Sequence, residues 1–450
     1  MSSQIDAKEE SYFSVLLSLL VLGGLFHYAE DWSNTLVTTV IVLTLMLALI
    51  YPKIQHWLFL IFTPYLIYIT AGKFPNIANH SNLYLIVLLA IFPAQLKAVL
   101  GKDVPLSDLL RTVRLFAFVL YFFTFFHKLN WDFLDPEISC AGKKLDGYLE
   151  LIPRSLSSVR QLLETLAPTL GLVIEGMIPL GLLVPKLRKV AIYTLLALHF
   201  MLAPMGFSDF SSLGVLLAWS FVDLERLEHQ DLLKHVGFLA TFCLTMQLYF
   251  APSRIPYGQE SYEFLEGILF SFVYGLFAFK YIVRNIDTRP LWFPKSVLYS
   301  ASVVCLFIFG FSNYLGLRTA GNFSMFSNLR TEGQVSNHLI LGSNPFKIFN
   351  FQEDVVKVLS VSRNGRGVYR RMPKPGQSIP RIEFDRLLKK MKFRTRGKGA
   401  VAMKVEYQGK EYQTSNAIFD QAFRFPVPPW QTKLFKFRAI QSSSRQQCAW

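Results

Sequence analysis

Long apolar stretches fill residues 14–312 of the chain, and ionisable side chains interrupt several of them. Hydrophobic residues make up 52% of the chain and charged residues 17%, whereas soluble proteins carry about 25% charged residues. Lys128, Glu175 and His199 lie inside or at the ends of these stretches. A charged group at the centre of a bilayer costs about 2.5–3.5 kcal/mol on insertion scales. We therefore predict a membrane protein in which these three groups share a polar pocket.

The spacing of the apolar stretches predicts an all-α polytopic membrane protein with about 9–11 transmembrane helices and a small C-terminal α+β extramembrane domain. Several stretches are near 15 residues long, whereas a helix needs about 20 residues to cross the hydrocarbon, so some must extend or re-enter. The candidate spans are residues 13–29, 36–51, 56–70, 83–97, 112–126, 167–184, 189–204, 209–222, 235–250, 264–281 and 296–312.

Positive charge is concentrated at the carboxyl end. Residues 313–450 contain 24 Lys and Arg against 8 Asp and Glu, whereas the rest of the chain contains 22 against 23. This change in composition predicts a boundary between a transmembrane helical domain, residues 1–312, and a basic α+β domain, residues 313–450.

Local patterns in the basic domain predict both strands and a helix. Val355–Val361 and Ala400–Tyr407 are typical of strands, and Gln408–Lys410 of a hairpin turn. Ile382–Phe393 has the apolar spacing of an amphipathic helix. The basic run Lys389–Lys398 fits either a patch for anionic lipid or nucleic acid, or a solvated helix face followed by a turn. We favour the solvated face and expect no nucleic-acid partner.

Lys and Arg are concentrated in the loops after the even-numbered spans. By the positive-inside rule, these loops and the amino terminus are cytoplasmic. With an odd number of spans, the C-terminal domain then lies on the outer or lumenal side. The basic loop 127–166 falls on that side too, which is allowed because long segments cross largely regardless of charge. The sequons at Asn79 and Asn322 also fall there.

The four cysteines are widely spaced, and no Cys/His pattern of a zinc or haem site is present. Walker A, GxSxG and HExxH motifs are absent as well, so the sequence offers no nucleotide, serine-hydrolase or zinc-peptidase site.

Polar residues follow the fifth predicted span in quick succession. His127, Lys128, Asn130 and Asp132 lie within two helical turns. A lysine desolvated at such a boundary can act as a base near neutral pH. It can equally extend its ammonium towards water and anchor the helix end.

Three further candidates lie in or beside other spans. Glu175 sits in the middle of an apolar run, where a carboxylate must be protonated or paired. His199 closes the seventh span; alone it would be a satisfied core residue, but with Glu175 and Lys128 it can complete a pocket. His80 lies in Asn79-His-Ser-Asn, which also fits a cluster of helix-capping residues.

These residues resemble a known family in their order and spacing. The Asn79-His-Ser-Asn-Leu-Tyr stretch, the His-Lys-Leu-Asn-Trp-Asp stretch around Lys128, Glu175 and His199 are similar to the horizontally transferred transmembrane (HTTM) superfamily over roughly residues 10–315. That superfamily includes the vitamin K-dependent γ-carboxylases.

The resemblance implies a chemistry. Lys128 matches the lysine that deprotonates reduced vitamin K on the lumenal side, after which oxygen makes a strong alkoxide base that removes a proton from a glutamate for CO2 addition. It implies a reduced quinone as cofactor. We predict that Glu175 and His199 are further catalytic residues that tune Lys128, because the three ionisable groups are expected in one pocket. We assign His127, Asn130 and His80 to substrate binding.

This chain departs from the carboxylases at several positions. His127 stands in place of a lysine and Asn130 in place of an aspartate, and Phe92-Pro-Ala-Gln-Leu-Lys replaces a polar stretch. The tail does not resemble the region that grips the carboxylase propeptide. We therefore expect a relative that uses Lys128 as a base on a lipophilic, quinol-like substrate within membrane lipids. The alternatives are a transporter or channel, and a membrane anchor that presents the basic domain.

Overall fold

The computed structural model divides the chain into two compact units. Unit 1 comprises Met1–Gly72, His80–Phe122 and Ile174–Phe307; unit 2 comprises Lys73–Asn79, Phe123–Val173 and Ile308–Trp450. The structure describes residues 2–28, 52–76, 78–102, 106–149, 153–227, 231–249, 260–333, 336–342, 346–362, 373–394, 401–441 and 445–448, with positions 43, 45 and 47. The span predicted at residues 36–51 lies almost entirely outside these ranges.

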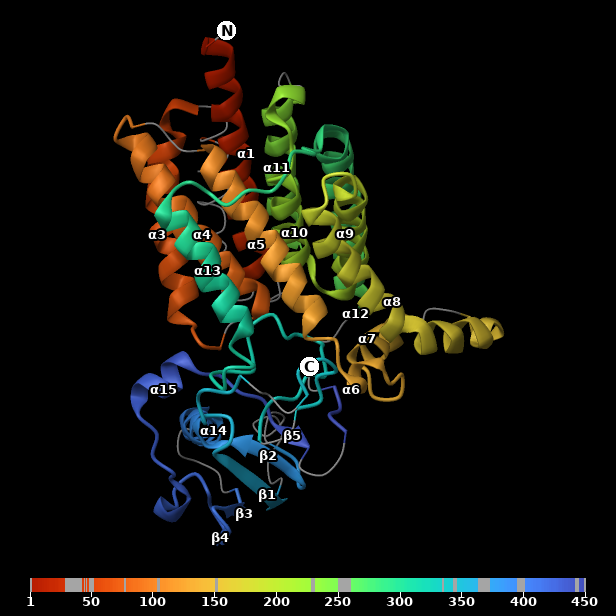
Figure 1. Cartoon of the computed structure of the whole chain (residues 1–450), viewed down its shortest axis with the longest axis vertical. Coiled ribbons are helices and arrows are strands. Elements are labelled where there is room, and N and C mark those ends of the chain that lie inside the picture. The colour runs from red at the N-terminus through yellow and green to blue at the C-terminus, as the bar shows by residue number, and fades with distance from the viewer. Residues whose placement is uncertain are drawn as a thin grey trace. The chain divides into compact units, whose positions relative to one another are not determined.

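Unit 1 is built from helices (Figure 1). Parts of four of them belong to unit 2: the first residue of α4, the carboxyl ends of α5 and α13, and the amino-terminal part of α8. The helices are α1 (Ser2–Tyr28), α3 (Pro52–Gly72), α4 (Asn79–Val99), α5 (Leu106–Phe126), α8 (Ser157–Leu183), α9 (Arg188–Leu202), α10 (Ser208–Trp219), α11 (Leu232–Tyr249), α12 (Glu260–Phe277) and α13 (Val297–Phe311).

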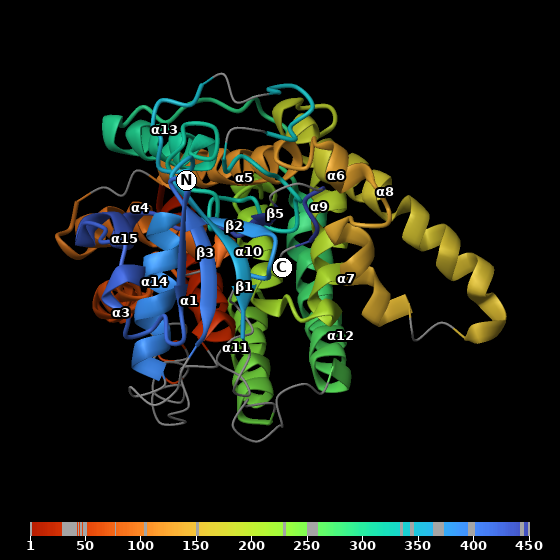
Figure 2. The same ribbon diagram turned by 90° about the horizontal axis from the view of Figure 1, so that it is seen from below.

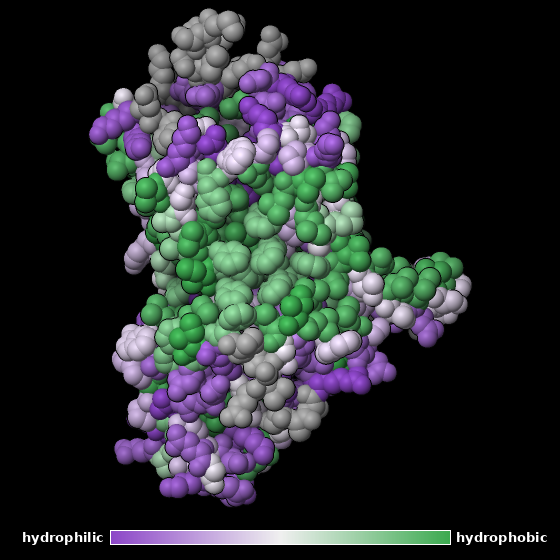
Figure 3. Space-filling view, in the orientation of Figure 1, coloured by the Kyte–Doolittle hydropathy of each residue, from purple (hydrophilic) through white to green (hydrophobic). Residues whose placement is uncertain are grey.

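Four segments among the described residues are long and apolar enough to cross a membrane. They are α4, α5, α8 and Phe264–Asn285, which continues α12. Each contains or overlaps a span predicted from the sequence, so the helix-rich part of the fold prediction is confirmed. On the face that Figure 3 shows, hydrophobic side chains form a band over the middle of the unit 1 helices, and hydrophilic side chains gather above it, where α5 begins.

Helix α10 stands where residues 209–222 are predicted to form a span. Its 12 residues reach about 18 Å, well short of the hydrocarbon thickness of about 30 Å. All of them except Asp209 are buried. Gly206, at φ 76°, takes the left-handed conformation that ends the preceding turn and reverses the chain from α9. The apolar run is therefore a core helix of unit 1. The sequence suggested a membrane span here because burial by other helices requires the same apolar residues as contact with lipid.

A buried ion cluster joins loops at the ends of the unit 1 helices. The Asp287 side chain is 1% exposed and accepts hydrogen bonds from Arg114 Nη1 at 2.8 Å and Arg289 Nε at 2.9 Å. Burial raises the pKa of Asp287, but the hydrogen bond from Arg289 and the charge of Arg114 outweigh it and bring the pKa to about 2. Arg188, fully buried, donates to the Asp287 carbonyl at 3.1 Å. Asp287 is therefore the anion that compensates buried guanidinium charge.

Unit 2 contains the α+β domain, an antiparallel sheet in the order β4-β3-β1-β2-β5 with α14 (Arg381–Arg394) beside it (Figure 2). Phe384, Leu388 and Met391 of α14 belong to one buried cluster with the inward side chains of the sheet. The strands are β1 (Val355–Val361), β2 (Gln377–Pro380), β3 (Met403–Tyr407), β4 (Lys410–Thr414) and β5 (Ile440–Gln441).

The local predictions in this domain are confirmed. Strands β1 and β3 and helix α14 lie where the sequence predicts them. Gln408 and Gly409 both have positive φ, 52° and 73°, as a two-residue hairpin turn requires. Lys389 of the basic run pairs with Asp385 at 2.6 Å, which fits a solvated helix face. Residues 395–398 of that run lie outside the described residues.

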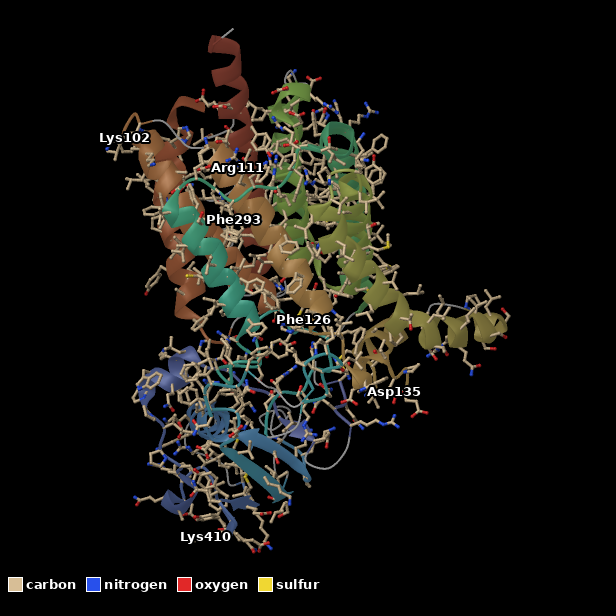
Figure 4. The ribbon with its side chains drawn as sticks, in the orientation of Figure 1. Lys102, Arg111, Phe126, Asp135, Phe293 and Lys410 are labelled. Atoms are coloured by element: carbon tan, nitrogen blue, oxygen red, sulfur yellow. A yellow bond between two sulfur atoms is a disulfide. The ribbon has the colours of Figure 1, made fainter. Side chains whose placement is uncertain are left out.

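Unit 2 also contains short helices and one covalent crosslink. Helices α6 (Trp131–Leu134) and α7 (Cys140–Leu149) follow α5, and a disulfide joins Cys140 to Cys448 across 308 residues of sequence. Asp135, labelled in Figure 4, pairs with Arg445. The sequence did not predict this crosslink, because spacing alone does not reveal which cysteines meet.

The glycosylation sequons are buried, which corrects their interpretation as outer-side acceptors. Asn322 is fully buried, and its amide donates to Ser312 Oγ at 2.9 Å and to the Arg318 carbonyl at 3.2 Å. Asn79 is 4% exposed at the start of α4. A glycan needs an exposed amide, so these sequons carry no information on sidedness.

Replacing Asp287 tests the ion cluster. Asp287→Asn keeps the shape of the side chain but leaves Arg114 and Arg188 buried without their anion, so we expect a loss of about 3–5 kcal/mol in stability. The midpoint of thermal unfolding in detergent measures it. Asp231→Asn is the matched control, because Asp231 is 53% exposed and pairs with exposed Lys234. The control should change stability by less than about 1 kcal/mol; equal effects would contradict this role for Asp287.

Candidate functional site

The predicted site residues belong to two different units. His80, Glu175 and His199 belong to unit 1, whereas His127, Lys128 and Asn130 belong to unit 2. Each cluster is described by itself.

His199 lies at the centre of the unit 1 cluster. Its side chain is fully buried, and its Nε2 lies 2.5 Å from Tyr121 Oη. The ring also packs edge-on against Phe210, with centroids 4.7 Å apart. Gly214 makes room for it, since a Cβ there would lie 2.2 Å from the imidazole Cδ2. This glycine lets α10 approach His199 closely.

His80 reaches the same cluster from the first turn of α4. Its Nε2 lies 2.7 Å from Asp209 Oδ2, and its ring stacks on Phe210 at 5.5 Å. Phe210 therefore contacts both histidine rings. The side chain of His80 is thus used in tertiary packing, beyond any role in capping α4.

Glu175 completes the cluster from α8. It is half-buried and interacts electrostatically with Tyr121, whose hydroxyl contacts His199. The structure thus groups Glu175, His199 and His80 around Tyr121 and Phe210. Sequence analysis missed Tyr121 and Phe210 because both lie in runs of aromatic and apolar residues that carry no distinguishing pattern.

Lys128 lies just beyond the carboxyl end of α5, two residues after Phe126, which is labelled in Figure 4. The residue is only 6% exposed. Its ammonium donates to the Thr124 carbonyl at 3.4 Å and lies 5.8 Å from the centre of the Phe133 ring. The side chain is therefore held inside unit 2, which does not fit a lysine that extends into water.

His127 is fully buried among neutral partners. Its Nδ1 lies 2.8 Å from Tyr314 Oη and its Nε2 lies 3.2 Å from the Asn322 carbonyl. Burial lowers the pKa of His127 well below its usual range; the Asn322 hydrogen bond opposes this shift, and the charges of His338, Arg438 and Lys128 add to it. His127 is accordingly neutral at pH 7 and adds no positive charge beside Lys128.

Asn130 has a structural role. Its Oδ1 caps α6 by accepting from the Phe133 amide at 2.8 Å, and its Nδ2 donates to the Ser327 and His127 carbonyls at 2.6 and 2.9 Å. These bonds account for its burial. We predicted that Asn130 binds substrate. It would have to do so with Oδ1 or Nδ2, which already make hydrogen bonds within unit 2.

Several polar residues of the unit 2 cluster were not singled out as site residues. Asn337 donates to Asp132 Oδ2 at 2.7 Å, and the same oxygen accepts from the Gln446 amide at 2.9 Å. Asn337 and Gln446 each lie more than 200 residues from Asp132 in the sequence, so no local pattern could reveal these contacts. Among the described residues, no group of three His, Cys, Asp or Glu side chains is arranged to hold a metal ion.

No protein-family model, curated protein or solved structure matches the chain. The similarity to the HTTM superfamily therefore stays an expectation from a few short stretches. The function has to be argued from the two clusters.

The buried histidine of unit 2 predicts a dependence of stability on pH. Because the pKa of His127 is lower when folded than its unfolded value of about 6.5, the unfolded chain binds more protons and stability falls as pH drops below about 6.5. His127→Gln should reduce that slope. His338, whose pKa burial also lowers, should account for part of the remainder.

Unfolding midpoints between pH 7.5 and pH 5.5 measure this slope. His235→Gln, a substitution in α11 of unit 1, controls for the general loss of a histidine. An unchanged slope in His127→Gln would show that His127 is not the group that titrates.

Proposed function

We propose that the chain is a multi-pass membrane enzyme related to the HTTM superfamily, in which Lys128 acts as a base on a lipophilic acid such as a reduced quinone. One observation carries the proposal. At the end of α5, a helix long enough to cross a membrane, a lysine is buried beside a histidine that is neutral at pH 7.

The surroundings of Lys128 suit a group that gains a proton. When Nζ accepts a proton from a substrate hydroxyl, an N–H bond forms, the O–H bond breaks, and the substrate oxygen keeps the electron pair. The new ammonium is stabilised by the Thr124 carbonyl and by the face of the Phe133 ring. Neutral His127 adds no repulsion to this step.

The roles of the unit 1 residues in this proposal are less direct. Glu175 and His199 would tune the reaction, and His80 would bind substrate. Support for them comes from the HTTM resemblance and from their grouping around Tyr121 and Phe210.

The disulfide supports an outer or lumenal position for unit 2, with the amino terminus in the cytoplasm. Disulfides persist in oxidising compartments and are rare in the cytosol. Cys140 and Cys448, which are bonded to each other, belong to the loop and the tail that the positive-inside rule also places outside.

Trapping thiols in intact cells tests this orientation. If unit 2 lies outside, an alkylating reagent added before lysis should leave Cys140 and Cys448 unlabelled until a reductant is added. Cys305, a free and exposed cysteine in α13, serves as the internal reference for labelling of denatured protein. Labelling of Cys140 without reductant would contradict the outer position.

Substituting Lys128 tests the enzyme proposal. We expect wild-type protein to co-purify with a quinone or similar lipid that mass spectrometry detects, and Lys128→Ala to lose it. Lys128→Arg keeps a cation but cannot act as a base near neutral pH, so it should lose turnover of that ligand. Lys143→Ala, at an exposed lysine of unit 2, is the matched control.

The outcomes separate the proposed functions. Full turnover by Lys128→Arg would exclude the base and leave Lys128 as a binding or structural cation. No specific ligand in either sample would favour a membrane anchor that presents unit 2. Cysteine accessibility of the unit 1 cluster from both membrane faces would favour a transporter or channel.

A further inference from the structure

Unit 2 exposes an apolar surface made by two segments that are far apart in the sequence. Phe346, Ile348 and Phe349 are 51%, 75% and 42% exposed. Trp430 and Leu434, in the short helix α15 (Pro429–Leu434), are 52% and 51% exposed. Single exposed apolar side chains are common, whereas adjoining ones mark a contact surface. We call these five residues the apolar face of unit 2.

The two segments pack on one aromatic side chain. The ring of Phe351 stacks on Phe349 with centroids 5.9 Å apart and meets Trp430 edge-on at 6.4 Å. Trp430 and Leu434 lie four residues apart in α15, so they share one side of that helix. Phe351 in turn packs against a buried cluster that includes Phe435. The apolar face is therefore one surface on a buried base.

The segment at residues 346–349 is turned opposite to an ordinary water-facing surface. Its charged residue, Lys347, has a side chain that is only 9% exposed. The Lys347 ammonium donates to the Gly333 carbonyl at 2.6 Å and to the Thr331 carbonyl at 3.1 Å. The lysine thus points inward while its apolar neighbours stay exposed. In water this orientation would leave apolar surface solvated at a cost in free energy.

This segment is attached where α13 ends. The Ile348 and Phe349 amides both donate to the Leu315 carbonyl, at 3.3 and 3.0 Å, four residues after the helix. The Phe346 ring lies 5.9 Å from the ring of Phe311, the last residue of α13. The apolar face therefore continues directly from the end of a helix that contains no charged residue.

The composition around the apolar face matches the border of a bilayer. Tryptophan is enriched where helices leave the hydrocarbon, and Trp430 belongs to this face. Lys433 is exposed in α15, next to Leu434. Residues 313–450 as a whole contain 24 Lys and Arg against 8 Asp and Glu. Such positive charge is attracted to anionic lipid headgroups.

We infer that the apolar face of unit 2 inserts into the lipid interface beside the end of α13, with Lys433 at the level of the lipid phosphates. A protein partner would cover the same area, but continuity with an apolar helix and the adjoining positive charge favour lipid. The inference rests on the membrane part of the proposed function and is independent of Lys128 as a base.

Spin-label accessibility in the full chain tests this. The chain is reconstituted in vesicles of phosphatidylcholine and phosphatidylglycerol, with a nitroxide on Ile348→Cys or on Leu434→Cys in a background that carries Cys305→Ser. Oxygen concentrates in lipid, whereas a nickel chelate stays in water. We expect the ratio of oxygen to nickel accessibility at both labels to be several times the ratio at Lys410→Cys, an exposed position in β4.

The chain without substitutions, labelled at Cys305, is the positive control, because Cys305 is free and exposed in α13. A Cys305 label in water would overturn the membrane proposal and this inference together. With Cys305 in lipid, nickel access at Ile348 and Leu434 equal to that at Lys410 would overturn the inference alone.

Two other results would also overturn it. Labels shielded from both reagents would show that a protein surface covers the apolar face. Oxygen access at only one of the two labelled positions would show that the two segments do not enter lipid as one surface.

Discussion

The pairing of the buried Asp287 carboxylate with arginine is the interaction on which unit 1 most depends. Arg114 of α5 donates to this carboxylate and Arg188 of α9 donates to the main-chain carbonyl of the same residue, inside the unit, where an unpaired charge would be costly. The backbone of Asp287 is hydrogen-bonded as well. Its amide donates to the Phe221 carbonyl at 2.7 Å, and next to it the Asp223 amide donates to the Asn285 carbonyl at 2.6 Å.

Around His127 and Asn130, the buried polar groups of unit 2 are bonded to neutral partners, whereas Glu332 and Arg438 form a buried ion pair in the same unit. Asparagine amides bond to backbone carbonyls that lie far away in the sequence: Asn130 to Ser327, and Asn328 to Ile138 and Gln446. His127 belongs to the same network, and burial lowers its pKa and keeps it uncharged, against the hydrogen bond from the Asn322 carbonyl. Lys128 lies beside this network, with its Nζ near the Thr124 carbonyl and the face of the Phe133 ring.

Sequence patterns predicted the elements whose stability is local. Strand β1, helix α14 and the hairpin at Gln408 follow from alternation, apolar spacing and turn chemistry within a few residues. The short edge strand β5 has two residues and exists only through pairing with β2, so it left no local trace. The apolar run at α10 was ambiguous, because the same apolar residues suit a helix that faces lipid and a helix that is buried among other helices. The candidate site residues stand out in the sequence by their chemistry, but the contacts of these residues with Tyr121, Tyr314 and Asn322 depend on long-range folding.

The disulfide has a consequence for the order in which the chain matures. Cys140 is made 308 residues before Cys448, which at ordinary rates of synthesis is a delay of roughly 15–60 seconds. In the proposed orientation, Cys140 therefore waits in an oxidising compartment while α8 to α13 are inserted. The bond between Cys140 and Cys448 can therefore form only after all the helices of unit 1 have been synthesised.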